Sequence, residues 1–369
     1  RFGVSAYPPT GVPYMARRAD PMDWENTDAE RSVDIALPRV TLVKGTVVEA
    51  STGNPVENAS ITFEGSGQSM PEGAIDGWQA RQGTDADGKF VYAVPAGRGT
   101  IVVHAKPNSN YVMKSMPSRK MTSGKPGGKR FYANAFKILD VEEGQDELEA
   151  RIELQVGNTV RGVLVDEDGL PIKETFINSR CTSRSLSGDW GGNLVPNIGS
   201  EFELKGLAPD ESYKVHFLDA KRKLGATMHI KGTDQDVRVV LKPCGTATAR
   251  FIVDDEDLRE KFPNFKVPPL RFVMTEGAVP FGEMMRRGEI AADETFMSNV
   301  DRINYGVDSR TWFLDKDLRL TLPALIPGAR YRLLISRTGV YTVGDEESLE
   351  FIAKSGPFDL GDVDHRNPR

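Results

Sequence analysis

The sequence predicts an all-β protein that consists of tandem β-sandwich domains. The main evidence is a repeat: Glu201–Phe217 (EFELKGLAPDESYKVHF) and Arg319–Ile335 (RLTLPALIPGARYRLLI) share one spaced apolar pattern, and Lys89–Val103 (KFVYAVPAGRGTIVV) is a looser copy. In each copy, apolar and polar residues alternate on both sides of a proline, as in two half-buried antiparallel strands joined by a turn. Such a repeat favours a row of similar β-domains over one large enzyme.

Length and composition agree with this prediction. A chain of 369 residues is long enough for roughly two to four domains, and its 36 glycines and 23 prolines allow the many turns of all-β domains. The net charge of −6 is modest and no basic run is sustained, so nucleic acid is not an expected partner. No apolar run approaches the roughly 18 residues of a membrane-spanning helix.

The first complete domain is expected to span residues 38–156. It opens with the strand–turn–strand segment Val40–Phe63, and Thr84–Gly88 (TDADG) forms a tight turn before the strand Phe90–Val94. The polar segment Pro107–Lys129 is expected to be a mobile loop. Two further strands close the domain: Thr100–Ala105 and Leu148–Leu154.

Residues 1–37 precede this domain and are interpreted as a partial preceding unit or a linker. Their stability would then depend on packing against the residues that follow. Because the chain starts at Arg1 without a methionine or a signal sequence, we expect it to be a processed or excised part of a longer protein.

The second domain is expected to span residues 157–243 and to open in the same way at Asn158–Ile177. In this opener, Gly162, Gly169 and Pro171 correspond to three earlier residues: Gly45, Gly53 and Pro55.

The third domain is expected to span residues 244–369, with Arg250 at the position of the opener glycine if Asp254 is aligned on Asp166. It carries a long insertion at 256–306, in which a short helix is expected around Glu283–Arg287. The unequal spacing of the openers favours separate domains with variable loops over a solenoid.

The openers KGTVVEASTGNPVENASITF and RGVLVDEDGLPI, the turn TDADGKFVYAVPAG and the closing pattern LxxLxPxxxYxVxF resemble those of the carboxypeptidase regulatory-like family. Members of that family are transthyretin-like, Ig-like β-sandwich modules. The resemblance covers most of residues 38–243 and, more weakly, 244–363. It implies tandem non-catalytic modules of a large extracytoplasmic bacterial protein, which is periplasmic, cell-surface or secreted. It also implies contacts with other proteins, cell-envelope components or glycans.

Trp78 (DGWQ) and Trp190 (GDWGGN) are the candidate ligand-binding residues, because they lie at similar places in expected loops of the first two domains. An aromatic ring on a loop can stack on a sugar or anchor a peptide. The alternative is that each ring covers the open edge of its own sandwich. Trp312 alternates like a strand residue and is expected to be packed.

Two Asp-rich turns are weak candidates for metal binding. Asp85 and Asp87, with the similar pair Asp166 and Asp168, could be Ca²⁺ ligands if about six oxygens converge. However, Gly88 follows Asp85 too closely for an EF-hand loop. The alternative is that these residues shape turns, and we predict no metal and no cofactor.

Histidines and cysteines do not cluster in the sequence. Two cysteines exclude a disulfide framework, although one bridge between Cys181 and Cys244 remains open. His104 and His216 occupy comparable positions on strands and are expected to face solvent or a loop. The other two histidines are scattered, which argues against a transition-metal site: His229 and His365.

The expected core consists of apolar residues at the alternating positions. Tyr213 and Tyr331 are predicted to bury their rings and to direct the hydroxyl to a backbone partner, because buried phenols rarely lack one. The remaining core residues are Val47, Phe63, Phe90, Tyr92, Val102, Leu164, Phe202, Leu204, Phe217, Leu322, Leu325 and Leu333.

The sequence predicts that the protein is not an enzyme, since no nucleophile–base signature such as G-x-S-x-G or H-E-x-x-H occurs and no catalytic residue is assigned. The first hypothesis is a structural or adhesive module array that binds proteins through loops and strand edges. The second is carbohydrate recognition through Trp78 and Trp190. The third, an enzyme with its site in the 256–306 insertion, is the least favoured.

Overall fold

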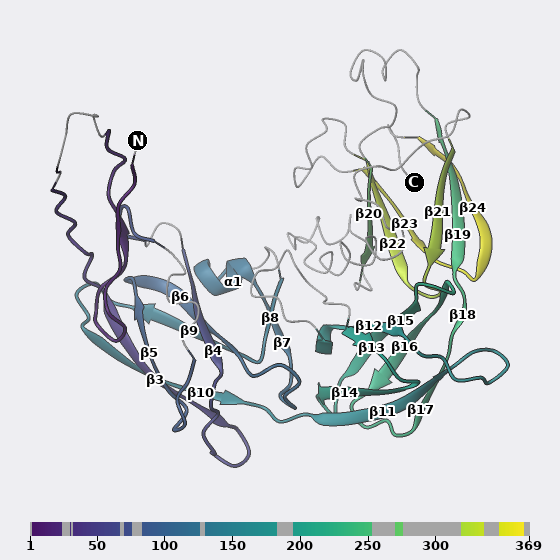
Figure 1. The fold of residues 1–369 in the computed structure, drawn as a ribbon, viewed down its shortest axis with the longest axis horizontal. Coiled ribbons are helices and arrows are strands. Elements are labelled where there is room, and N and C mark those ends of the chain that lie inside the picture. Colours follow the sequence, from purple (N-terminus) through teal and green to yellow (C-terminus); the bar gives the residue numbers. More distant parts are fainter. Residues whose placement is uncertain are drawn as a thin grey trace. The chain divides into compact units, whose positions relative to one another are not determined.

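The computed structural model describes residues 2–23, 30, 32–66, 70–75, 83–125, 130–182, 195–252, 270–275, 319–335 and 347–364. Regular structure in these residues is nearly all strand (Figure 1), which confirms the all-β class. The chain forms two compact units. Unit 1 comprises Arg1–Pro126 and Ala133–Val156, and unit 2 comprises Gly127–Tyr132 and Gly157–Arg369.

Unit 1 contains two three-stranded sheets that share one core. The first has the order β10-β3-β5, formed by Glu147–Leu154, Thr41–Glu49 and Lys89–Val94, and β10 runs parallel to β3. The second is antiparallel, with the order β4-β6-β9, formed by Ser60–Gly65, Gly97–His104 and Ala135–Val141. Residues from both sheets meet in one apolar cluster that includes Val47, Ile61, Phe90, Val103 and Ile152.

The N-terminal segment packs on this sandwich. It contains the short pair β1 (Ser5–Ala6) and β2 (Arg17–Arg18). Met15 is buried in a small cluster with Val40, Leu42 and Ala93 of the sandwich. The segment therefore draws stability from the residues that follow it.

The expectation of a mobile loop at Pro107–Lys129 is wrong for part of that segment. It contains strand β7 (Lys114–Pro117) and helix α1 (Ser118–Ser123), and β8 (Arg130–Ala133) pairs with β7. Met121 of α1 is fully buried, and its carbonyl accepts a 2.8 Å hydrogen bond from the Thr100 hydroxyl of β6. One apolar side chain and one polar anchor thus hold α1 on the sheet, although the surrounding sequence is polar.

Unit 2 repeats this arrangement twice. Its first pair of sheets has the orders β14-β11-β17 and β13-β12-β15-β16-β18. These strands, with the 3₁₀ turn Arg180–Thr182 after β12, are β11 (Asn158–Val165), β12 (Thr175–Asn178), β13 (Val195–Asn197), β14 (Glu201–Leu207), β15 (Ser212–Asp219), β16 (Leu224–Lys231), β17 (Val237–Val240) and β18 (Lys242–Pro243).

The second pair of sheets in unit 2 has the orders β21-β19-β24 and β20-β22-β23. One of its strands, β20 (Leu270–Thr275), lies inside the expected insertion 256–306 and pairs with β22. Residues around Glu283–Arg287 lie outside the described ranges. The other strands are β19 (Gly245–Ile252), β21 (Arg319–Leu325), β22 (Arg330–Ile335), β23 (Glu347–Ile352) and β24 (Gly356–Asp364).

One sheet order therefore recurs three times along the chain. In each case the opening strand (β3, β11, β19) lies between an antiparallel strand (β5, β14, β21) and a parallel closing strand (β10, β17, β24). The match of the first two openers is confirmed, since Pro55 bridges to Val48 as Pro171 bridges to Val165. The three-domain division itself remains a prediction.

The opener glycines are explained by a ring that lies over them. Gly45 is opposite Phe90, and Gly162 is opposite Phe202. A Cβ at either glycine would collide with that ring. In the third opener the residue in this register is Ala249, opposite Leu320, so the assignment of Arg250 to the glycine position is wrong by one residue. A leucine leaves room for one methyl group where the larger ring does not.

The predicted core is confirmed for every member whose side chain the structure describes, and Leu333 lies outside that set. The tyrosine prediction is also confirmed. Tyr213 and Tyr331 are fully buried, and their hydroxyls accept hydrogen bonds of 2.8 Å from the backbone N–H of Ala208 and Ile326. Both bonds reach back five residues across the proline turn, which fixes the hairpin against the core.

Candidate functional site

Several residues singled out in the sequence lie outside the described residues. These are Trp78, Trp190, Trp312 and His365. The structure therefore leaves the aromatic-loop hypothesis as a prediction.

The Asp-rich turns have one shared geometry. Asp85 Oδ1 accepts hydrogen bonds from the backbone N–H of Asp87 (3.0 Å) and Lys89 (2.8 Å). Asp166 Oδ1 does the same for residues 168 and 170, at 3.1 and 2.8 Å. The glycine that ends each turn, Gly88 or Gly169, has a positive φ of 72° or 81°, which glycine adopts at low cost.

These contacts use the carboxylates for turn formation. Asp87 adds an exposed ion pair to Lys89 at 3.1 Å. Within the part of the chain that the structure describes, no group of three His, Cys, Asp or Glu residues could hold a metal ion. Neither turn supplies a ligand cage.

The two cysteines are both free thiols. Cys244 is partly buried, and burial raises the pKa of its thiol to about 12, which keeps it protonated and unreactive at neutral pH. Cys181 is also only partly exposed and packs against the core of β11–β17.

The expectation that His216 faces solvent or a loop is wrong as to solvent, since the ring is buried on a face that a turn covers. His216 is 2% exposed and its Nδ1 lies 2.9 Å from the hydroxyl of Thr227. It sits on β15, an inner strand of its sheet, between Asn178 on β12 and Thr227 on β16. The turn after β21 covers this face, because a Cβ placed on Gly328 would lie 3.3 Å from Thr227 Cβ. His104 is partly exposed.

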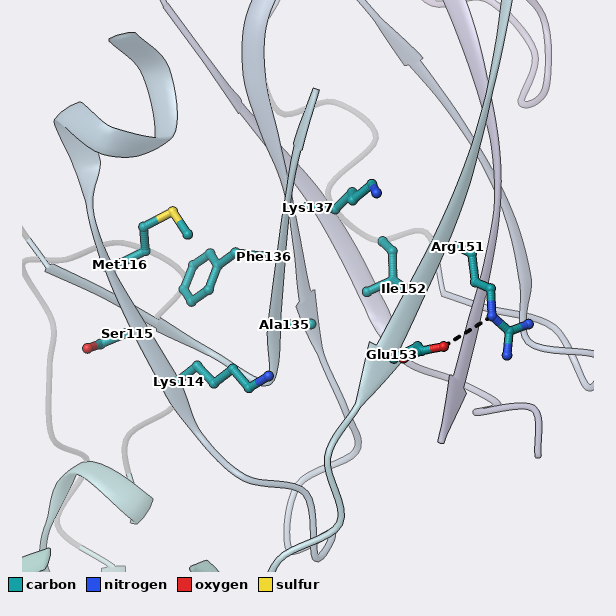
Figure 2. Close-up of a pocket in the computed structure, with 9 residues that line it drawn as sticks. All are labelled: Lys114, Ser115, Met116, Ala135, Phe136, Lys137, Arg151, Ile152 and Glu153. Carbon is teal, nitrogen blue, oxygen red and sulfur yellow. Dashed lines mark hydrogen bonds and ion pairs between the residues drawn. The ribbon is translucent and has the colours of Figure 1, made fainter. Parts of the chain in front are cut away.

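A groove of about 240 Å³ lies in unit 1. Three strands line it: β7, β9 and β10 (Figure 2). We call it the β9–β10 groove and define it by Lys114 and Met116 of β7, Phe136 and Lys137 of β9, and Arg151 and Ile152 of β10. Both β9 and β10 are end strands of their sheets among the described residues, so the groove lies where the sandwich is open.

Apolar side chains line the interior of the groove. Phe136 points from β9 toward β7 and lies beside Met116, while Ile152 points from β10 toward β9 (Figure 2). Ile152 belongs to the buried core, whereas Phe136 and Met116 are partly exposed. The lining therefore offers apolar contacts on both sides of β9: Phe136 with Met116 on the β7 side, and Ile152 on the β10 side.

Cations surround this interior. Lys114 and Lys137 are exposed, and neither forms an ion pair with a described residue. Arg151 pairs with Glu153 at 3.3 Å, with both side chains more than half exposed. Elsewhere on the two sheets of unit 1 the strand cations are paired: Lys44 with Glu147, Lys89 with Asp87 and Arg98 with Asp140.

Sequence reasoning did not find this groove. Lys114 lies in the segment Pro107–Lys129, which the sequence predicts to be a loop, and Lys137 lies in no predicted strand. The alternating pattern of Ala135–Val141 (AFKILDV) was the available signal.

The comparisons with known proteins assign no family. No protein-family model matches the sequence, and no characterised protein is similar to it at a significant level. The resemblance to carboxypeptidase regulatory-like modules therefore remains a prediction.

The solved structures that match this chain include the following three. The Bacillus anthracis TIE protein is 11% identical with a TM-score of 0.20, over 88% of this chain and 50% of that one. The major pilin subunit BcpA of Bacillus cereus is 9% identical with a TM-score of 0.19 (88% and 99%). A DUF3823 family protein from Bacteroides uniformis is 13% identical with a TM-score of 0.21 (85% and 99%). At this level the likeness assigns no activity.

Within the described ranges, no helix has the length and the hydrophobicity needed to cross a lipid bilayer.

Proposed function

We propose that this chain is a non-catalytic array of β-sandwich modules in an exported or cell-envelope protein. It spaces or displays attached domains and binds other proteins through loops and strand edges. The observation that carries the proposal is the recurring sheet order, which places a parallel closing strand at the edge of a sheet three times: β10, β17 and β24.

An edge strand presents backbone donors and acceptors that another chain can use. In β10 and β17 exposed residues alternate with buried or partly buried ones, as in β10, where Glu149, Arg151 and Glu153 are exposed. Charged residues at an edge limit nonspecific pairing while they leave room for a complementary partner. A repeated, charge-protected edge suits a protein that contacts others.

Site-specific photo-cross-linking in cells that make the full-length protein tests the proposal. A photoreactive amino acid is placed at exposed edge positions, Glu149 of β10, Arg238 of β17 and Asp359 of β24. Lys44 on the inner strand β3 serves as the control position. We expect discrete cross-linked proteins from at least one edge and from an envelope or secreted fraction. A cytoplasmic location, or no cross-link at any edge, would contradict the proposal.

The alternative, carbohydrate binding through Trp78 and Trp190, rests on the sequence. A glycan array with the whole chain separates the two. Binding of a sugar that is lost in Trp78→Ala and Trp190→Ala, with the melting temperature retained, would favour a carbohydrate-binding module.

A further inference from the structure

We propose that the β9–β10 groove of unit 1 binds an extended acidic segment of a partner protein and takes one apolar side chain of that segment into its interior. This inference deepens the proposed function, on which it rests, by giving the interaction a location and the partner a chemistry. Three properties of the groove carry it: its place between two end strands, its apolar interior and its unpaired cations.

The charge of the groove selects an acidic ligand. The lining contains Lys114, Lys137 and Arg151 against the single carboxylate of Glu153. Both lysines come from different strands and lie on the same groove, where Lys114 extends toward β9 and Lys137 toward β10 (Figure 2). The chain has a net charge of −6, and the cations on the surrounding strands each pair with a carboxylate. The two groove lysines differ from them because neither has such a partner among the described residues. Carboxylates of a ligand would supply the missing partners.

The interior of the groove selects a polypeptide over an acidic polysaccharide. Met116, Phe136 and Ile152 offer an apolar and polarisable surface, against which the hydroxyl groups of a sugar acid would lack hydrogen-bond partners. A volume of about 240 Å³ holds one side chain of a peptide and is small for a whole ligand. The two end strands beside it favour an extended conformation of that peptide.

Fluorescence anisotropy with the full chain tests the assignment. The probe is a short fluorescein-labelled peptide with a central phenylalanine between alternating glutamates and threonines. Two comparison peptides carry lysine in place of glutamate, or serine in place of phenylalanine. We expect the acidic phenylalanine peptide to bind at least about tenfold more tightly than the lysine peptide, and its affinity to fall as NaCl is raised.

The decisive variant reverses both unpaired lysines, Lys114→Glu with Lys137→Glu. Its matched control reverses two paired, exposed lysines of the same unit, Lys44→Glu with Lys89→Glu, and so changes the net charge equally. The groove variant is expected to weaken binding of the acidic peptide at least about tenfold, and the control variant less than about threefold. If the groove variant fails to fold, as judged by circular dichroism, Lys137→Gln is measured in its place, and it should still weaken binding.

Three results would overturn the assignment. They are equal binding of the acidic and lysine peptides, equal affinities of the groove variant and the wild type, and tighter binding of an oligogalacturonate than of the peptide. Loss of the phenylalanine should also weaken binding, since a purely ionic contact would not depend on it. If the peptide does not bind the groove but cross-links form through β17 or β24, the proposed array function still holds. Only the assignment of this groove is then refuted.

Discussion

The buried imidazole of His216 makes the stability of unit 2 depend on pH. His216 is 2% exposed, so protonation would place a charge between two sheet neighbours, Asn178 and Thr227, under the turn that contains Gly328. Burial is the main cause that lowers the pKa of His216 from 6.5 to about 3, and the charges of Lys214 and His229 lower it further. The imidazole is therefore neutral in the folded protein.

The sign and size of the effect follow from this pKa. Between pH 6.5 and about 3, the unfolded chain binds a proton at His216 and the folded chain does not. The stability that the neutral imidazole confers is therefore complete above pH 6.5 and is lost as the pH falls through this window. The expected loss is about 1.4 kcal/mol per pH unit, or about 2 kcal/mol between pH 7 and pH 5.

Calorimetry of the wild type and of His216→Gln at pH 7 and pH 5 measures this loss. The other groups titrate in both proteins, so the difference between their pH dependences isolates His216. We expect the variant to be less stable at pH 7 and to lose about 2 kcal/mol less on acidification. An NMR titration in which the His216 ring protonates near pH 6.5, or an unchanged pH dependence in His216→Gln, would refute the reasoning.

Three further predictions concern the fold. Tyr213→Phe should lower the free energy of unfolding by about 1–3 kcal/mol, because the buried N–H of Ala208 loses its acceptor, and Tyr213→Ala should lower it by about 3 kcal/mol or more. Chemical denaturation measures both losses. A loss of less than about 1 kcal/mol in the alanine variant would place Tyr213 outside the core. Gly162→Ala should lower the free energy of unfolding by about 1–3 kcal/mol in the same assay, because a Cβ would collide with the Val237 carbonyl oxygen and would lie 2.5 Å from the Phe202 ring. Gly199→Ala, with no contact closer than 3.8 Å, should change little. Asp166→Ala should lower the free energy of unfolding by about 1 kcal/mol, because two backbone N–H groups lose their acceptor. If added Ca²⁺ stabilised the wild type more than the variant, that result would instead favour a metal site.

Much of the local structure could be predicted from the sequence. The alternating pattern on both sides of a proline identified β14 with β15 and β21 with β22, because period-2 burial is a property of each strand alone. The same pattern identified Tyr213 and Tyr331, whose identical spacing from the turn gives identical hydrogen bonds. Glycine and aspartate at fixed offsets identified the turns at Asp85 and Asp166.

The register of the third opener was not determined by the sequence. Alignment on Asp254 placed Arg250 at the glycine position, whereas pairing with β21 places Ala249 there. A one-residue shift moves every side chain to the opposite face, so Arg250 points outward and pairs with Asp362 at 2.7 Å. Only the partner strand fixes such a register.

The candidate site depended on tertiary structure in the same way. Lys114, Phe136 and Arg151 belong to three strands distant in sequence, and only the packing of β7, β9 and β10 brings them to one groove. Likewise, the turn that contains Gly328, more than a hundred residues after His216, lies against Thr227, the side-chain partner of His216. The sequence by itself determined the strand class, the repeated hairpins and their buried tyrosines, because alternation and turn chemistry are local. The tertiary structure decided register, which faces are covered and where charges gather, because these depend on which strands lie next to one another.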